Sequence, residues 1–304
     1  MAVKSVQAVI NGTTVTLTYN SSNGKYEATV TAPAKSSYNV NSGHYYPVTV
    51  KATDEAGNTT TKTDSDATLG ASLKLKVKEK VAPTISISGP TAGSYLATSK
   101  PSIIWTVTDA DSGVNPSTIG ITIDSGSKIT GDGIKRETVS GGYRCTYTPT
   151  TALSDGPHTI KIDASDYDGN AAVQKSVKFT IDTVPPTLSI TSPSDKLVTN
   201  KTEITVTGKT NDVTSSPVTL TIKLNGGNAE TVEVGTDGSF SKSLTLSAGV
   251  NTITTVARDA AGKITTVVRT VTVDQTAPVI KSVTIAPNPV DAGKTYLISV
   301  EVTD

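Results

Sequence analysis

The sequence predicts an all-β protein, built of tandem β-sandwich domains in an extended rod. Three observations lead to this fold class. Runs of about 5–8 residues rich in Thr and Val are separated by turn phrases such as SSNGK, LNGG and TDG. No stretch sustains an apolar period of 3.6 residues, so we expect no substantial helix. Two phrases also recur along the chain at intervals of roughly one hundred residues.

The first recurring phrase marks the predicted domain boundaries. It reads KEKVAPTISISGP at 78–90, IDTVPPTLSITSP at 181–193 and VDQTAPVIKSVTI at 273–285. Each phrase is a short polar link, then a proline, then the start of a strand, where a missing N–H is tolerated. Pro83, Pro186 and Pro278 lie 103 and 92 residues apart, which is the length of one immunoglobulin-type sandwich.

The second recurring phrase falls late in each predicted domain. It reads YYPVTVKATDEAGN, PHTIKIDASDYDGN and VNTITTVARDAAGK, with an alanine two residues before Asp54, Asp166 and Asp259. Apolar residues alternate before that alanine, which predicts a strand with one buried face. The acidic segment after it contains glycine and predicts a tight turn. We therefore identify strand F and the FG loop of an immunoglobulin-like sandwich.

These phrases divide the chain into an immunoglobulin-like domain 1 at 1–80, a second at 81–184 and a third at 185–275. Residues 276–304 are interpreted as a partial fourth unit or a docking segment, because ISVEVTD at 298–304 parallels the strand B phrase IIWTVTD at 103–109. Two strands do not close a sandwich. Either the chain is shortened at this end or another subunit supplies the missing strands.

Composition excludes several classes of protein. Lys plus Arg equals Asp plus Glu at 27 each, so the net charge gives no attraction to nucleic acid or to an anionic membrane surface. No apolar stretch is long enough to insert in a membrane, and the first residues lack the apolar core of a signal peptide. The single cysteine, Cys145, excludes an intramolecular disulfide and is expected to be a small core residue.

The run of TAP or VPP, a strand such as SITSP, NTITTVARDAAGK and then TVTVD resembles bacterial Ig-like repeats. Such repeats occur in surface adhesins, in accessory regions of secreted glycosidases and in tail-associated proteins of phages and prophages of Gram-positive bacteria. Residues 185–275 match best, and residues 1–80 match only through ATDEAGN. The resemblance is specific for fold and weak for activity.

We predict no catalytic residues. His44 and His158 have no Ser or Cys partner in a recognisable nucleophile motif. His158 occupies the position of Tyr46 at the start of strand F, where a tyrosine often bonds back to the preceding corner. Trp105 shares a face with Ile103 and Val107 and is expected in the core, not on a sugar-binding surface.

Calcium is the one cofactor that the sequence suggests. The loops after strands B and F should meet at the junction of the first two domains, and they carry five acidic residues with the linker: Glu79, Asp109, Asp111, Asp166 and Asp168. Carboxylates brought this close favour Ca²⁺, which takes six to eight oxygen ligands. The alternative is ordinary turn chemistry, in which Asp bonds its own backbone. The next junction has fewer acids, Asp182, Asp212 and Asp259.

The function expected is a non-catalytic structural or adhesion role, with a phage virion component first among three settings. The others are a stalk of a bacterial cell-surface adhesin and an accessory region of a secreted glycosidase, so the expected location is the virion, or else the cell surface or the medium. Tyr38, His44 and Tyr45 are candidate partner-binding residues. Partners would be virion or surface proteins, through residues 276–304, or a host-surface glycan or protein.

Overall fold

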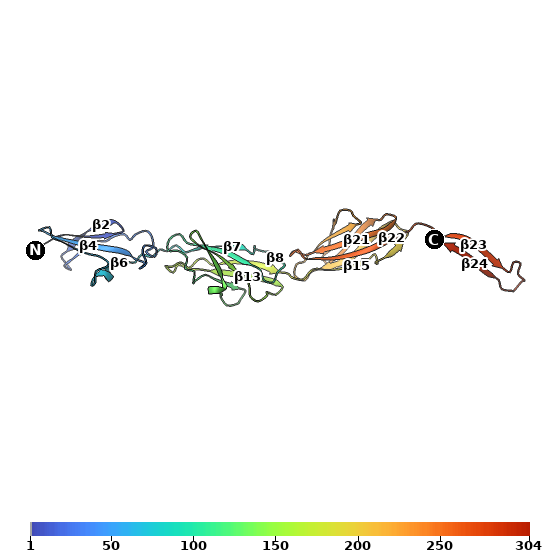
Figure 1. Ribbon diagram of the computed structural model, residues 1–304, viewed down its shortest axis with the longest axis horizontal. Helices are drawn as coiled ribbons and strands as arrows, with labels where there is room; N and C mark the ends of the chain where they lie inside the picture. The colour runs from blue at the N-terminus through green and yellow to red at the C-terminus, as the bar shows by residue number, and fades with distance from the viewer. Residues whose placement is uncertain (1) are drawn as a thin grey trace. The chain divides into compact units, whose positions relative to one another are not determined.

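The computed structural model describes residues 2–304, which form 24 strands and two short 3-10 helices (Figure 1). The predicted all-β class is therefore confirmed. By compactness the described chain divides into two units: one extends to Ile181, and the other takes Asp182–Asp304 together with Tyr95–Ala97. No helix within residues 2–304 is both long and apolar enough to span a membrane.

Residues 81–181 fold as two packed sheets. The first sheet has the order β11-β12-β9-β7, and β10, β13 and β14 are neighbours in the second. This is the ABED and CFG arrangement of an immunoglobulin-type sandwich. The elements are β7 (Thr84–Gly89), β8 (Tyr95–Leu96), β9 (Ile103–Thr108), β10 (Gly120–Ile123), η2 (Gly131–Gly133), β11 (Lys135–Val139), β12 (Gly142–Tyr147), β13 (Gly156–Asp163) and β14 (Lys175–Ile181).

The core of this sandwich is where the alternation predicted it. Ile103, Trp105 and Val107 on β9 are fully buried, and so are Ile160 and Ile162 on β13. Cys145 is also fully buried, and burial raises the pKa of its thiol to about 11. Trp105 and Cys145 are thus core residues, as expected.

Residues 185–275 form a second sandwich of the same kind. One sheet has the order β15-β17-β20 and the other β16-β22-β21-β18-β19, around a core that includes Val206, Leu220, Ile253 and Ala257. The elements are β15 (Thr187–Ser192), β16 (Leu197–Thr199), β17 (Glu203–Asn211), β18 (Thr219–Leu224), β19 (Glu230–Val232), β20 (Ser239–Thr245), β21 (Gly249–Arg258) and β22 (Ile264–Val273).

Residues 3–75 differ from the expected sandwich, because their strands belong to one six-stranded sheet. Its order is β3-β2-β1-β4-β5, and β6 also pairs with β4. The elements are β1 (Val3–Ile10), β2 (Thr13–Asn20), β3 (Lys25–Glu27), β4 (Tyr46–Asp54), β5 (Thr59–Lys62), η1 (Gly70–Leu73) and β6 (Lys74–Leu75). The sheet has no second sheet opposite it among the described residues.

This sheet is equivalent to the CFG sheet of the two sandwiches. β4 carries the strand F phrase and pairs with β1, as β13 pairs with β10 and β21 with β18. A residue with a positive φ also ends each of these partner strands: Asn11, Asp124 and Asn225, at 47°, 53° and 51°. Asn and Asp tolerate this left-handed conformation better than other residues with a side chain. β1 is therefore a strand C.

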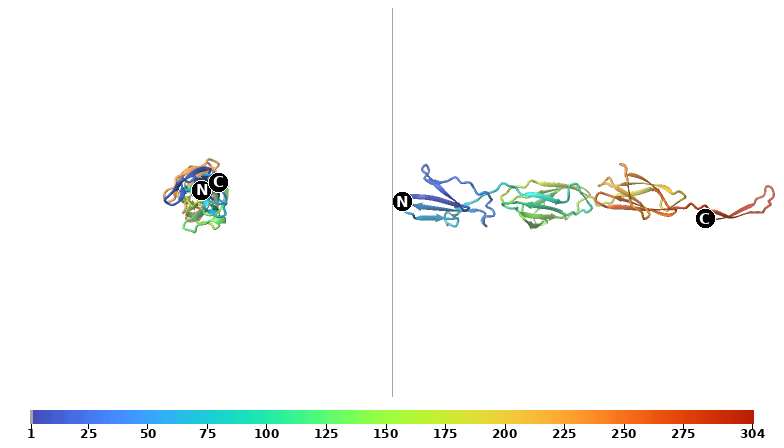
Figure 2. Two further views of the ribbon diagram at one scale, coloured as in Figure 1. Left: turned by 90° about the vertical axis from the view of Figure 1, so that its left-hand side faces the viewer. Right: turned by 90° about the horizontal axis from the view of Figure 1, so that it is seen from above.

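Residues 276–304 form a hairpin of β23 (Val279–Ala286) and β24 (Leu297–Thr303), drawn in red in Figure 2. The two strands are antiparallel, with Val283 opposite Val300 and Ile285 opposite Ile298. Every residue of the hairpin is exposed. The predicted pair of strands is thus present, and no further described strand pairs with it.

The predicted turn after strand F is identical in three places. The carboxylates of Asp54, Asp166 and Asp259 each accept a hydrogen bond from the backbone N–H four residues later, at 2.7–2.8 Å. The backbone N–H of each aspartate in turn donates to the carbonyl of that later residue. Aspartate thus closes the turn through its own side chain.

The predicted corner at the start of strand F is also present. His158 Nε2 lies 2.8 Å from the carbonyl oxygen of Ser154, and Asn251 Nδ2 donates to the carbonyl of Ser247 at 2.7 Å. Tyr46 Oη donates to the carbonyl of Lys35 at 3.3 Å. Three different side chains therefore make the same kind of bond to the preceding loop.

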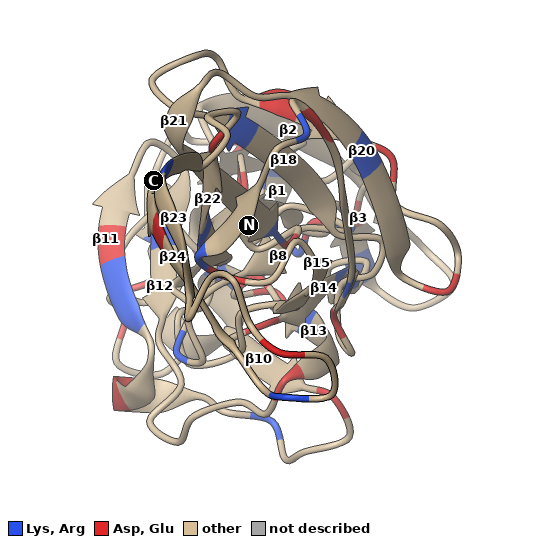
Figure 3. Cartoon of the chain, turned by 90° about the vertical axis from the view of Figure 1, so that its right-hand side faces the viewer, with Lys and Arg blue, Asp and Glu red and all other residues tan. Residues whose placement is uncertain are grey.

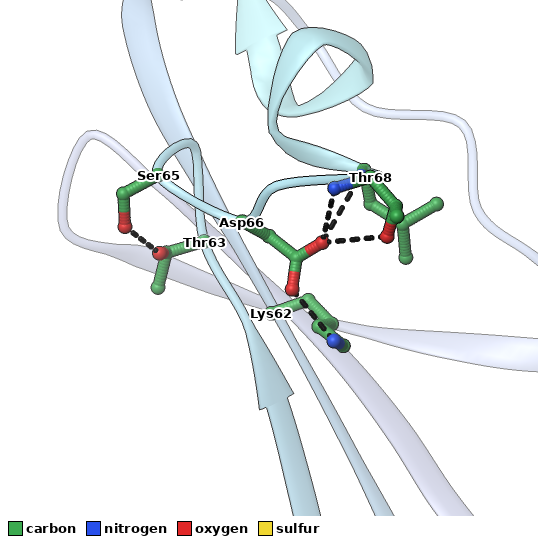
Figure 4. Close-up of polar contacts among 6 residues, drawn as sticks. Lys62, Thr63, Ser65, Asp66 and Thr68 are labelled. Carbon is green, nitrogen blue, oxygen red and sulfur yellow. Dashed lines mark hydrogen bonds and ion pairs between the residues drawn. The ribbon is translucent and has the colours of Figure 1, made fainter.

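Some charged side chains on the surface pair with near neighbours. Asp66 accepts bonds from Lys62 Nζ at 2.6 Å and from the backbone N–H groups of Thr68 and Leu69, which joins β5 to η1 (Figure 4). The Lys62 ammonium and then these N–H groups hold the pKa of Asp66 well below its usual range. Figure 3 shows both signs of charge on β11, where Lys135 Nζ lies 3.0 Å from Glu137.

We predict that His158→Ala destabilises residues 81–181 by about 2–3 kcal/mol, because it leaves buried polar groups unpaired. Burial alone would lower the pKa of His158, but the Ser154 carbonyl and the Asp124 carboxylate together raise it. A raised pKa adds stability that is complete below the unfolded value of about 6.5 and is lost as pH rises through the folded value. Urea unfolding followed by Trp105 fluorescence should show that the difference in free energy of unfolding between wild type and His158→Ala becomes smaller as pH rises.

His158→Asn is the matched variant, because Asn251 fills the same position in the third sandwich. It should retain most of the stability and should remove the protonation-dependent part. A difference in free energy of unfolding between wild type and His158→Asn that does not change with pH would contradict the conclusion that Asp124 helps to raise the pKa of His158.

Candidate calcium sites

Two groups of three carboxylates stand out among residues 2–304. Glu79, Asp109 and Asp166 form one group, and Asp182, Asp212 and Asp259 form the other. Within each group the candidate ligand oxygens all lie within 4.8 Å of one another. Each group combines a linker residue with the loop after strand B and the loop after strand F.

Strand ends position the first group. Asp109 follows β9, and its Oδ1 accepts the backbone N–H groups of Asp111 at 3.0 Å and Gly113 at 2.7 Å. Asp166 follows β13 and binds Asn170 through both oxygens. Glu79 Oε1 accepts the N–H of Ser112 at 2.6 Å. Asp109 and Asp166 are buried, whereas Glu79 is half-buried.

Two members of the predicted set are separate from the other three. Asp111 and Asp168 lie outside the group of clustered carboxylates. Asp111 Oδ2 accepts the backbone N–H of Ser36 at 2.9 Å, and Asp168 Oδ2 accepts that of Glu79 at 3.0 Å. These two hydrogen bonds join separate segments of the chain, and a role of Asp111 and Asp168 in binding calcium stays a prediction.

The second group is the more deeply buried. Asp182 is fully buried, and Asp212 and Asp259 are each 6% exposed. Asp212 Oδ1 accepts the N–H groups of Thr214 and Ser215, and Asp182 Oδ2 accepts the hydroxyl of Ser215 at 2.5 Å. The lower number of acids predicted a poorer site here, but the structure brings three carboxylates together in both places.

Asp259 provides the observation that points to a cation. Its Oδ1 accepts the N–H of Lys263, whereas its buried Oδ2 has no hydrogen-bond partner. A buried carboxylate oxygen without a donor is strongly disfavoured. Two unit negative charges at 4–5 Å repel by roughly 3–4 kcal/mol at an effective dielectric of about 20, which exceeds the roughly 1 kcal/mol that a typical hydrogen bond returns.

A hard divalent cation would bind the unpaired Oδ2 of Asp259 and would offset the repulsion between the carboxylates. Ca²⁺ binds six to eight oxygens from carboxylates, backbone carbonyls and water, and it tolerates irregular geometry. Asp182, Asp212 and Asp259 fit such an ion, since each offers an oxygen to the same small volume. No sequence motif marks Ser215, which contacts both Asp182 and Asp212, because its position depends on how the loop after β17 folds.

The candidate partner residues do not act as one surface. The Tyr38 ring stacks on His44 at 4.0 Å and on Tyr167 at 4.1 Å between ring centroids. The Tyr45 side chain instead contacts residues 64–74: its hydroxyl donates to Asp64 at 2.8 Å, and Lys74 lies over its ring. Tyr38 thus packs within the chain, and the partner role of Tyr38, His44 and Tyr45 stays a prediction.

Comparisons with known families agree with this architecture. Residues 84–183 match the bacterial Ig-like domain, and residues 186–275 match domain B of glucodextranase. A segment of 128 residues is 32% identical to Bacillopeptidase F of Bacillus subtilis. That segment is 42% of this chain and only 8% of Bacillopeptidase F.

Solved structures with a similar course of the chain are distant in sequence. Fibronectin(III)-like modules of Clostridium thermocellum CbhA match 63% of this chain and 94% of their own, with 18% identity and a TM-score of 0.38. Drosophila N-cadherin EC1-3 matches 88% of both chains, with 17% identity and a TM-score of 0.29.

We predict that millimolar Ca²⁺ raises the melting temperature of residues 182–275 by roughly 10 °C, relative to chelator. This assumes a Kd near 0.1 mM, typical of extracellular modules, and about 10 mM ion, which together stabilise by about 2.7 kcal/mol. Asp259→Asn should abolish this shift in differential scanning calorimetry. In chelator it should melt no lower than wild type, because it removes one repelling charge and keeps Oδ1.

Asp237→Asn is the control. Asp237 lies on the surface of the same sandwich, bound to Ser239 and Lys209, so its calcium response should equal that of wild type. If calcium and chelator give the same melting temperature for wild type, the three carboxylates are only turn residues.

Proposed function

We propose that this Ig-like repeat protein is a non-catalytic spacer that works outside the bacterial cell and holds neighbouring parts of a larger protein or assembly at a fixed separation. The observation that carries the proposal is the junction between residues 1–80 and 81–181, which lie in one compact unit. A spacer requires a junction that resists bending. Here residues 36–39 and the linker contact both the loop after β9 and the loop after β13.

The loop after β9 binds the first region directly. Asp111 accepts the N–H of Ser36, and Asn39 Nδ2 donates to the carbonyl oxygens of Asp111 at 2.6 Å and Ser112 at 3.2 Å. Tyr38 stacks on Tyr167 from the loop after β13, with an angle of 12° between the rings. Direct bonds and a stacked pair leave this junction little freedom to bend.

The linker itself is bonded to the loop after β13. Lys78 Nζ donates to the carbonyl of Asp168 at 3.1 Å, and the N–H of Glu79 donates to the Asp168 carboxylate. Asn170 Nδ2 donates back to the carbonyl of Glu79 at 3.2 Å. A linker held by its own backbone groups transmits the orientation of one region to the next.

The comparisons favour one of the three settings. The glucodextranase domain B match and the similarity to a short part of Bacillopeptidase F support an accessory region in a longer bacterial enzyme. They lend no support to the virion, which stays a prediction. The carboxylate groups also favour an extracellular site, because modules of this kind bind Ca²⁺ at the 10⁻⁴–10⁻³ M that prevails outside cells.

The contacts of the two histidines and the cysteine are in keeping with a non-catalytic role. His158 closes a corner, His44 stacks on Tyr38 while its Nδ1 bonds the Tyr38 carbonyl, and the Cys145 thiol is buried. A nucleophile or a general base must reach a substrate. Two of these groups, His158 and Cys145, are buried, and His44 is exposed but uses its ring face and its Nδ1 in contacts within the protein.

We predict a narrow distribution of distances between spin labels at Lys51→Cys and Ser127→Cys, measured by double electron–electron resonance on the full chain. Both positions are exposed, and Cys145 should escape labelling because it is buried and its thiol pKa is raised. Tyr38→Ala combined with Asn39→Ala should widen the distribution at least twofold, because it removes the stack and two hydrogen bonds.

Tyr19→Ala is the control, because Tyr19 is 55% exposed and lies on β2. It should leave the distribution unchanged. A broad distribution in the wild-type background would identify a flexible tether and refute the spacer.

A further inference from the structure

Three asparagines are followed by glycine, Asn11, Asn23 and Asn225, and each is exposed in a loop between two strands. Asparagine is a thermolabile residue. The backbone nitrogen of the next residue can attack its side-chain carbonyl carbon, and glycine has no side chain to obstruct that approach. The attack requires a side chain that is free to turn. The hydrogen bonds of the three asparagines therefore decide which of them reacts.

Asn225 is held by the strand opposite. Its Oδ1 accepts the backbone N–H of Thr252 at 2.8 Å, and its Nδ2 donates to Oδ1 of Asn251 at 3.2 Å. Its own backbone N–H donates to the carbonyl of Thr252 at 2.7 Å. Both polar atoms of the Asn225 amide are thus bonded, and these bonds must break before the side chain turns to the nitrogen of Gly226.

The same arrangement is found in residues 81–181. Asp124 takes the position of Asn225, and its Oδ1 accepts the N–H of Thr159 at 2.8 Å. The N–H of Asp124 donates to the carbonyl of Thr159 at 2.7 Å. Thr159 and Thr252 both follow the corner residue at the start of strand F. In both sandwiches a backbone N–H of strand F therefore fixes the side chain that ends strand C.

The first region has a proline in place of this donor. The antiparallel register of β1 and β4 places Asn11 opposite Pro47, which follows the corner residue Tyr46. Proline has no N–H, so Asn11 cannot receive the bond that fixes Asp124 and Asn225. Within residues 2–304 the Asn11 side chain has no hydrogen-bond partner. Asn11 is therefore free to turn toward the next residue.

Asn23, in contrast, is held in its own loop. Its Oδ1 accepts the N–H of Lys25 at 3.0 Å, and its Nδ2 donates to Glu27 at 2.9 Å. The N–H of Gly24 donates to the last carbonyl of β2 at 2.9 Å, so the attacking nitrogen is also engaged. The N–H of Gly12 has no acceptor among the described residues. The side chain and the nucleophile are thus both free only at the first of the three pairs.

We propose that the pair Asn11–Gly12 is a site at which this chain modifies itself. The Gly12 nitrogen bonds to Cγ of Asn11, the Cγ–Nδ2 bond breaks, and Nδ2 leaves as ammonia with the proton of the Gly12 N–H. Water then opens the resulting succinimide at either of its carbonyls. The products are aspartate and isoaspartate, and each adds one negative charge to the loop.

The reaction changes the turn that joins β1 to β2. Ile10 pairs opposite Thr13, so the loop has two residues, with φ of 47° at Asn11 and 75° at Gly12. Two positive φ values are typical of a type I′ turn, which sets the register of a hairpin. Isoaspartate adds one carbon atom to the main chain, so it should loosen the pairing of β1 with β2. The reaction needs no partner and does not depend on the spacer role.

The test is peptide mapping by mass spectrometry of the folded full chain, kept for weeks in mildly alkaline buffer, where each conversion adds about 1 Da. Asn11 should convert at least roughly tenfold faster than Asn225, which must first lose two hydrogen bonds. Asn23 lies in the same tryptic peptide, between Lys4 and Lys25, and is the internal control. In urea the three asparagines should convert at similar rates, because no hydrogen bond then protects any of them.

Pro47→Thr gives the decisive comparison, because it supplies the missing N–H from the residue type that the two sandwiches use. Conversion of Asn11 should slow roughly tenfold, while that of Asn23 stays as in wild type. Pro47→Ala supplies the same N–H without a β-branched side chain and should act in the same way.

Two outcomes would overturn the proposal. One is a folded wild type in which Asn11 converts no faster than Asn225. The other is an unchanged rate at Asn11 in both variants of Pro47. Neither outcome bears on the spacer, which is tested by the label distances.

Discussion

The opposition of two apolar sheet faces is the constraint on which the structure depends. In residues 81–181, β9 places Ile103, Trp105 and Val107 against a sheet that contributes Ile160 and Ile162, and all five are fully buried. Since the chain has one cysteine and cannot form an internal disulfide, this packing is its main source of stability. In residues 3–75, which have one sheet, the equivalent side chains of Ile10, Val48 and Val50 are only half-buried.

The same constraint positions the polar chemistry. Strand B and strand F belong to different sheets of one sandwich, and they end at the same pole. Packing the sheets together therefore brings the loop after β9 to the loop after β13, and the loop after β17 to the loop after β21. Three carboxylates meet at each of these poles. Asp54 makes the same turn in the first region, but within residues 2–304 it belongs to no group of three carboxylates.

Local sequence was sufficient for features that a strand and its turn determine alone. The alternation in TIKIDA and TITTVA indicated which face is buried, because the side-chain period of a strand is two. The Asp–Gly turns followed from the ability of Asp to accept a backbone N–H four residues later. The corner formed by His158 followed from its alignment with Tyr46, and its bond to Ser154 confirms it.

Other features depended on contacts between distant segments. Sequence placed Glu79, Asp109, Asp111, Asp166 and Asp168 at one pole, but only the fold separated the clustered acids from the two that bind backbone N–H groups of residues 36 and 79. It likewise could not show that Tyr38 stacks on Tyr167 or that residues 3–75 have a single sheet. The repeats could be recognised from the sequence, because the pattern of strands and turns is a local property. Tertiary structure decided which carboxylates meet and which faces are covered, because those depend on sheets that pack across long separations in the chain.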